Sequence, residues 1–80
     1  MRLDKFLKVS RIIKRRTVAK EACESERVTI NGKIAKSSTT VKEGDVIEIT
    51  FANRSLKAEI INIAEHVRKD DAKEMYRIIE

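Results

Sequence analysis

The spacing of apolar residues changes once along the chain, near Arg27, and this change limits the possible folds more than any other feature. Before it, Leu3, Phe6 and Leu7 recur at the spacing that places them on one side of a helix. After it, residues 47–51 of the segment 46–51 alternate between apolar and polar side chains, as in a half-buried strand. Helices followed by strands predict an α+β domain, with two N-terminal amphipathic helices packed on a small, mostly antiparallel sheet.

The two expected helices cover residues 2–10 and 17–25. Lys5 and Lys8 would lie on the first helix opposite its apolar side, and Thr17 is the expected N-cap of the second helix. Four residues of the second helix are expected to face inward, namely Val18, Ala19, Ala22 and Cys23.

Asn31-Gly32, between the β-prone segments 28–30 and 33–35, predicts a hairpin with a type I′ turn. Further strands are expected at 46–51 and 56–63, although the pair Ile60-Ile61 breaks the alternation and leaves a bulge or burial on both faces open. A short helix over 70–75, capped by Asp70 or Asp71, and a strand over 76–79 would end the fold. Met75 and Ile79 are expected in the core.

Nothing in the sequence divides the chain, so residues 1–80 are expected to form one domain. There is no proline, no linker and no repeat, and Cys23, expected to be buried, has no partner for a disulfide within the chain. No uncharged run, residues 60–64 included, exceeds five residues, far fewer than the roughly 20 of a membrane span. We therefore expect a cytoplasmic protein that does not contact a membrane.

Positive charge is concentrated in the first 36 residues. This segment holds eleven basic and four acidic residues, for +7, whereas residues 37–80 sum to −2. Such polarity favours a polyanionic partner over a surface that is merely solvated. Because the chain has only three aromatic residues, recognition should use phosphates, riboses and the shape of folded RNA rather than stacking on bases.

The start of the second helix is the expected centre of this site. Free backbone N–H groups and the positive end of the helix dipole would bind phosphate beside Arg16, Thr17 and Lys20. Lys33 and Lys36 would lie nearby if the hairpin packs against the helices. Asp4 has two readings: it supports the first helix through its dipole and a pair with Lys8, or it orients basic side chains of the site.

An ordered series of motifs resembles the alpha-L RNA-binding domain, also called the S-four domain. The series is Arg2 to Leu7 (RLDKFL), Thr17 to Lys20 (TVAK), Val28 to Lys33 (VTINGK) and Val41 to Asp45 (VKEGD). The likeness covers residues 1–51 and leaves 52–80 as a short, strand-rich C-terminal extension. Glu26 departs from the family pattern, because a glycine usually ends the second helix there in a left-handed conformation.

Within this family the chain is similar to the short RqcP family of bacterial ribosome quality control. The resemblance implies binding to ribosomal RNA and tRNA on the large ribosomal subunit, where a partner factor adds alanine tails. We also expect a monomer. The expected RNA-binding residues are Arg2, Lys5, Lys8, Arg11, Lys14, Arg15, Arg16, Thr17, Lys20, Asn31, Lys33 and Lys36.

Other functions stay open. A heat-shock protein that binds free large subunits is a more distant relative, so subunit recycling or ribosome assembly is one alternative, and a protein–protein module with an acidic partner is another. No nucleophile–base pair or carboxylate dyad of recognisable spacing appears, so we expect no enzyme activity and no cofactor. One cysteine and one histidine cannot form a zinc site by themselves, and His66 is expected at the surface.

Overall fold

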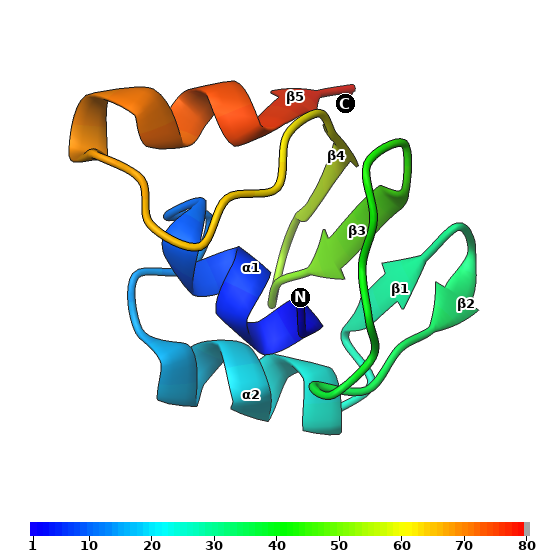
Figure 1. Cartoon of the computed structure of the whole chain (residues 1–80). Helices are drawn as coiled ribbons and strands as arrows, with labels where there is room; N and C mark the ends of the chain where they lie inside the picture. The colour runs from blue at the N-terminus through cyan, green and yellow to red at the C-terminus, as the bar shows by residue number, and fades with distance from the viewer. Residues whose placement is uncertain (80) are drawn as a thin grey trace.

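The computed structural model describes residues 1–79 and shows an α+β fold, as the sequence predicts (Figure 1). Two short helices come first, followed by strands and one 3-10 helix. The elements are α1 (Leu3–Val9), α2 (Arg16–Glu24), β1 (Val28–Ile30), β2 (Lys33–Ile34), β3 (Val46–Thr50), β4 (Ser55–Ile60), the 3-10 helix η1 (Lys69–Met75) and β5 (Tyr76–Ile78). The strands form one antiparallel sheet in the order β2-β1-β3-β4-β5.

The hairpin between β1 and β2 has the predicted turn. Asn31 and Gly32 both have positive φ angles, 53° and 86°, as a type I′ turn requires. Thr29 pairs with Ile34 and Ile30 pairs with Lys33, so the turn consists of two residues. The Asn-Gly signal therefore set both the position and the register of this hairpin.

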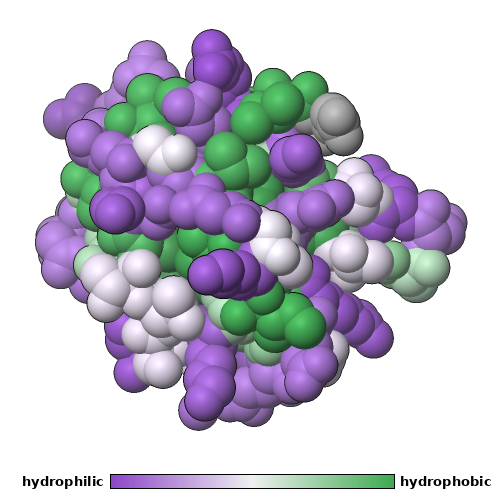
Figure 2. Space-filling view, turned by 90° about the vertical axis from the view of Figure 1, so that its right-hand side faces the viewer, coloured by the Kyte–Doolittle hydropathy of each residue, from purple (hydrophilic) through white to green (hydrophobic). Residues whose placement is uncertain are grey.

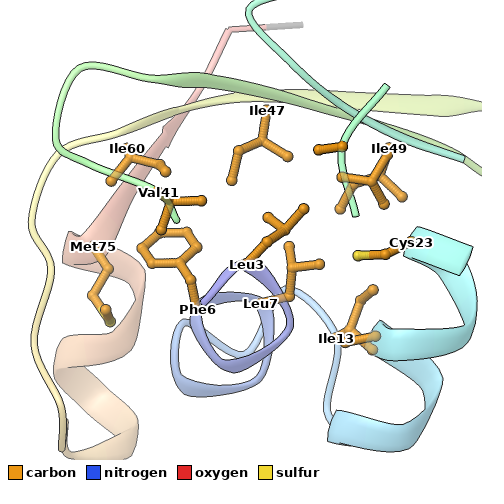
Figure 3. Close-up of a cluster of buried hydrophobic side chains, with 13 residues drawn as sticks. Leu3, Phe6, Leu7, Ile13, Cys23, Val41, Ile47, Ile49, Ile60 and Met75 are labelled. Carbon is orange, nitrogen blue, oxygen red and sulfur yellow. The ribbon is translucent and has the colours of Figure 1, made fainter. Parts of the chain in front are cut away.

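The core lies between α1 and one face of the sheet. Leu3, Phe6 and Leu7 are fully buried, and Figure 3 shows them beneath Ile47 of β3. Full burial of a large apolar side chain contributes roughly 1.5–3 kcal/mol, so this stripe of α1 is a major source of stability. Cys23 is buried as expected, and burial together with the charges of Asp4 and Glu24 raises the pKa of its thiol to about 11.

The start of α2 differs from the prediction. The N-cap is Arg15, with extended φ and ψ of −117° and 133°, and it makes no side-chain capping hydrogen bond, so Thr17 lies inside the helix. Ala19 and Cys23 are buried, but Val18 is 45% exposed and was wrongly expected to face inward. The buried residues of α2 are small, so only a narrow side of the helix contacts the core. Val18 lies 100° around the helix from Ala19 and therefore falls outside that side.

Glu26 ends α2 in the same conformation that the family glycine would adopt. This residue adopts the left-handed conformation with φ 62° in place of the family glycine. The N–H of Glu26 donates to the carbonyl of Cys23 at 3.0 Å, and the N–H of Arg27 donates to that of Ala22 at 3.1 Å. These two bonds define a Schellman motif, so the helix ends as it would with glycine.

The C-terminal part contains the expected short helix and strand, with three corrections. β4 ends at Ile60 and does not reach residue 63, because the amides of Ile61 and Asn62 both donate to the carbonyl of Met75, at 2.8 and 3.2 Å. The Ile60-Ile61 pair is thus the end of a strand, with Ile61 45% exposed. Met75 is buried, but Ile79 is 45% exposed because it follows β5, which lies at the edge of the sheet.

The third correction concerns the start of η1. Its N-cap is Arg68, which makes no side-chain capping hydrogen bond, and Asp70 and Asp71 lie in the first turn.

Among the described residues, no helix combines the length and apolar character needed to cross a membrane.

Candidate nucleic-acid interface

The expected basic residues of the two helices are at the surface. Lys5 is half-buried, and the others on α1, α2 and their connection are exposed: Arg2, Lys8, Arg11, Lys14, Arg15, Arg16 and Lys20. In Figure 1, α1 lies between α2 on one side and the segment that follows β4 on the other. The fold therefore places these cations around one short helix. We call this set, together with Thr17, the helix-pair surface.

A buried carboxylate organises the helix-pair surface. The side chain of Asp4 is 3% exposed and lies between two arginines that are about half-exposed. Arg2 donates to both of its oxygens, at 3.2 and 3.3 Å, while an Nη2 atom of Arg16 lies 3.5 Å from Oδ1. The carboxylate thus joins the start of α1 to the start of α2 and fixes where both guanidinium groups lie.

Asp4 also supports its own helix. Its Oδ1 accepts a hydrogen bond of 2.8 Å from the backbone N–H of Lys5. Asp4 lies in the first turn of α1, where the helix dipole favours a negative charge. The expected partner Lys8 does not appear in its ion pairs among the described residues, which join Asp4 to Arg2 and Arg16. Both readings of Asp4 thus hold in part: it supports the helix through the dipole, and it orients the arginines.

The environment of Asp4 keeps it charged. Burial alone would raise its pKa, but the hydrogen bond from Arg2, the N–H of Lys5 and the charges of Arg16 and Arg2 together lower the pKa below the ordinary value of 3.8. Asp4 is therefore a permanent anion at neutral pH. Two arginines share one buried negative charge, which leaves a net positive group with exposed N–H donors.

The beginning of α2 supplies backbone donors beside these arginines. The first amide with a carbonyl partner in the helix is that of Ala19, which donates to Arg15 at 3.0 Å, and no side chain caps the helix. The N–H groups of the first turn are thus available to an anion, with Arg15 and Arg16 beside them. Lys20 is 56% exposed and lies one turn further along, where it pairs with Glu24 at 3.9 Å.

The hairpin residues do not join this centre. Lys33 lies on β2, an outer strand of the sheet, and Lys36 lines a recess with Glu24 and Glu26 at the C-terminal end of α2. The expectation that both lysines lie beside the N-terminus of α2 is therefore wrong, because the hairpin extends along the sheet. The side chain of Asn31 donates a hydrogen bond to Asp45 at 3.1 Å and accepts one from the N–H of Val46 at 2.9 Å. It therefore connects the turn between β1 and β2 to the turn before β3.

The side of the molecule that carries β1 and β2 is mainly hydrophilic. Figure 2 shows this face, where apolar groups form separate patches and not one broad area. Ile34 of β2 is 60% exposed. No group of three or more His, Cys, Asp or Glu side chains in residues 1–79 is arranged to hold a metal ion.

Sequence reasoning did not identify one contact made by the helix-pair surface. Lys5 pairs through its Nζ with Glu65 Oε1 at 3.1 Å, which brings the segment after β4 against α1. Residues 60 positions apart in the sequence meet here. No local pattern marks such a pair, because it depends on where β4 ends.

An antiparallel sheet that supports a basic helix pair defines a class of RNA-binding modules, and the comparisons agree. The model of the S4 domain family matches residues 1–47. The chain is 56% identical to the RQC P-site tRNA stabilizing factor of Halalkalibacterium halodurans, over 98% of this chain and 89% of that protein. It is 53% identical to the protein of the same name from Streptococcus pneumoniae, over 99% and 90% of the two chains.

Among solved structures, heat shock protein 15 of Vibrio cholerae, determined as a trimer, superimposes with a TM-score of 0.89 and 32% identity, over 98% of this chain and 80% of that one. The chain therefore belongs to the S4 domain family, and within it to the family of the RQC P-site tRNA stabilizing factors.

Proposed function

We propose that this protein binds ribosomal RNA and tRNA on the large ribosomal subunit and so assists the alanine tailing of stalled nascent chains in ribosome quality control. One observation carries the proposal: the buried carboxylate of Asp4 holds Arg2 and Arg16 beside the uncapped start of α2. The name of its relatives, RQC P-site tRNA stabilizing factor, supports the same role.

The chemistry of this centre suits RNA phosphates. Each guanidinium offers a planar set of donors that can grip a phosphate through two parallel hydrogen bonds, and Asp4 reduces the freedom that each side chain would lose on binding. An RNA backbone that folds back on itself could place phosphates at both the arginines and the start of α2. The protein would act by holding RNA in place, without catalysis.

The setting of this role is also part of the proposal. The protein would act in the cytoplasm as a monomer on the ribosome and would cooperate with a factor that adds the tail. Light scattering of the free protein tests the monomer, because a protein that assembles like the trimeric heat shock protein 15 of Vibrio cholerae would show three times the chain mass.

Arginine substitutions test where the RNA binds. Arg16→Ala should weaken binding to large subunits by about 10- to 150-fold, the equivalent of losing one charge-assisted contact of about 1.5–3 kcal/mol. Arg54→Ala and Arg77→Ala remove the same charge from residues outside α1 and α2: Arg54 covers the ring of Phe51, and Arg77 of β5 pairs with Glu59. Equal losses for all three variants would show that only total charge matters.

The likeness to heat shock protein 15 favours a second candidate, a role in recycling or assembly of large subunits. Sedimentation through a sucrose gradient separates the two. Co-migration with large subunits that carry peptidyl-tRNA supports quality control, whereas co-migration with empty or precursor subunits supports recycling or assembly. Absence from every ribosomal fraction would instead favour a protein partner.

A further inference from the structure

A small recess opens where the end of α1 meets the segment that follows β4. It is lined by Lys8, Val9, Arg11, Glu65, His66 and Val67, and its volume is about 140 Å³. At roughly 30 Å³ per water molecule, this is space for about four or five waters, or for one phosphate group that displaces them.

The segment that carries His66 is held in place on both sides. Before it, the carboxylate of Glu65 accepts a hydrogen bond of 3.1 Å from the ammonium group of Lys5. After it, Val67 is half-buried against the hydrophobic core. His66 is thereby fixed next to Lys8 and Arg11, although 55 residues separate it from Arg11 in the sequence.

The charges of the recess favour an anion. Lys8 and Arg11 contribute two positive charges, and the negative charge of Glu65 is already matched by Lys5. The imidazole of His66 can donate a hydrogen bond in its neutral form as well as in its charged form. Three donors of different reach therefore line one cavity that is large enough for a phosphate.

The backbone of Arg11 ends α1. Its φ angle is 63°, in the left-handed region that glycine and asparagine adopt easily and other residues adopt at an energetic cost. The N–H of Arg11 donates to the carbonyl of Lys8 at 3.0 Å, so Arg11 occupies the left-handed position that follows a helix, as Glu26 does after α2. Glycine at position 11 would relieve the strain and remove the guanidinium.

We propose that His66, together with Lys8 and Arg11, binds a phosphate group of the RNA, so that the segment after β4 extends the helix-pair surface. This inference rests on the proposed function and adds a contact that lies outside the S4 domain match, which ends at residue 47. It makes the C-terminal extension part of the interface as well as a cover for the core.

The test is a binding titration of the full chain with purified large subunits that carry tRNA. His66→Ala should weaken binding by about 3- to 10-fold, the effect of one hydrogen bond to a charged group, and His66→Gln, which keeps a donor, should lose less. Lys73→Ala, an exposed position on η1, is the control and should bind like wild type. Because Lys8 and His66 share one ligand, the double variant should lose less than the product of the single losses.

Arg11→Gly gives a second readout that a purely structural role would not produce. It should melt at the same temperature as wild type or higher, while its affinity for large subunits falls by about 10-fold or more. Unchanged affinity in His66→Ala, or losses of Lys8→Ala and His66→Ala that simply multiply, would overturn the phosphate recess. If Arg16→Ala still weakens binding by about 10-fold or more in that case, the proposed function stands without the recess. If wild type itself does not bind, both fail.

Discussion

At the level of single residues, we expect Asp4 to link the stability of the helix pair to its capacity to bind RNA. Asp4→Asn keeps the size of the side chain but removes the charge that holds Arg2 and Arg16. We expect a loss of about 1–3 kcal/mol in the free energy of unfolding and weaker binding to large subunits. The substitution raises the net charge by one, so diffuse attraction alone would strengthen binding. Tighter binding by Asp4→Asn would contradict the organising role.

The pH dependence of that stability difference gives a separate prediction. The pKa of Asp4 is lower in the folded protein than its ordinary value of 3.8, so its ionisation favours the folded state above that value. The contribution disappears as the pH falls through the folded-state pKa, where wild type carries a neutral carboxyl group that resembles Asn. Denaturant titrations should show that wild type and Asp4→Asn differ less in their free energy of unfolding at about pH 3 than at pH 7. A constant difference would mean that the charge of Asp4 does not stabilise the fold.

Glu26 offers a substitution that should stabilise the protein. It is exposed and holds φ 62°, the left-handed value that glycine adopts without steric cost. Glu26→Gly should raise the free energy of unfolding by about 0.5–1 kcal/mol, after allowance for the greater freedom of glycine in the unfolded chain. Glu26→Gln removes the same charge but keeps the strain, so it controls for electrostatics. A thermal melt in which both variants gain equally would assign the effect to charge.

At the level of elements, the turn between β1 and β2 tests a purely conformational requirement. A Cβ atom at Gly32 would meet nothing within 4 Å, so Gly32→Val acts through the φ angle of 86° alone. We expect a loss of about 1–3 kcal/mol in a thermal or denaturant melt. Lys33→Ala, its exposed neighbour, should change stability by less than about 0.5 kcal/mol, and its RNA affinity tests whether the interface reaches β2.

Either result of this pair is informative. If Gly32→Val melts like wild type, the type I′ turn is not required for the fold. If Lys33→Ala binds RNA normally, the RNA interface does not extend to β2.

Local sequence patterns predicted most of the elements but not how they meet. The helices, the hairpin, β3 and the final helix and strand follow from apolar spacing and from turn residues such as Asn31-Gly32. The end of β4 was missed, because Ile61 and Asn62 bond to the carbonyl of Met75 and not to a neighbouring strand.

The same limit applies to the site. The charge pattern predicts which basic residues the candidate site uses, and one of the two readings of Asp4 is that it orients basic side chains. The pairing of Asp4 with Arg16 and the contact of Lys5 with Glu65 are set by packing between separate elements. No spacing rule reports these features.

At the level of the whole molecule, the uneven charge predicts how binding responds to salt. Each phosphate contact releases counterions, so the logarithm of the binding constant falls with the logarithm of salt concentration by about 0.7 to 0.9 per contact. With about six contacts on the helix-pair surface, we expect a slope of roughly −4 to −5. A titration over a range of salt concentrations measures it. A slope shallower than about −2 would rule out a phosphate-dominated interface.

The core also determines when the RNA surface can form during synthesis. Leu3, Phe6 and Leu7 of α1 pack in one cluster with Ile60 and Met75, which the ribosome adds much later (Figure 3). At about 5–20 residues per second, the basic N-terminal segment leaves the ribosome several seconds before its apolar partners. Met75 of η1 is thus among the last parts of this cluster to be made. We therefore expect the core beneath the helix pair to be completed only in a late step of synthesis.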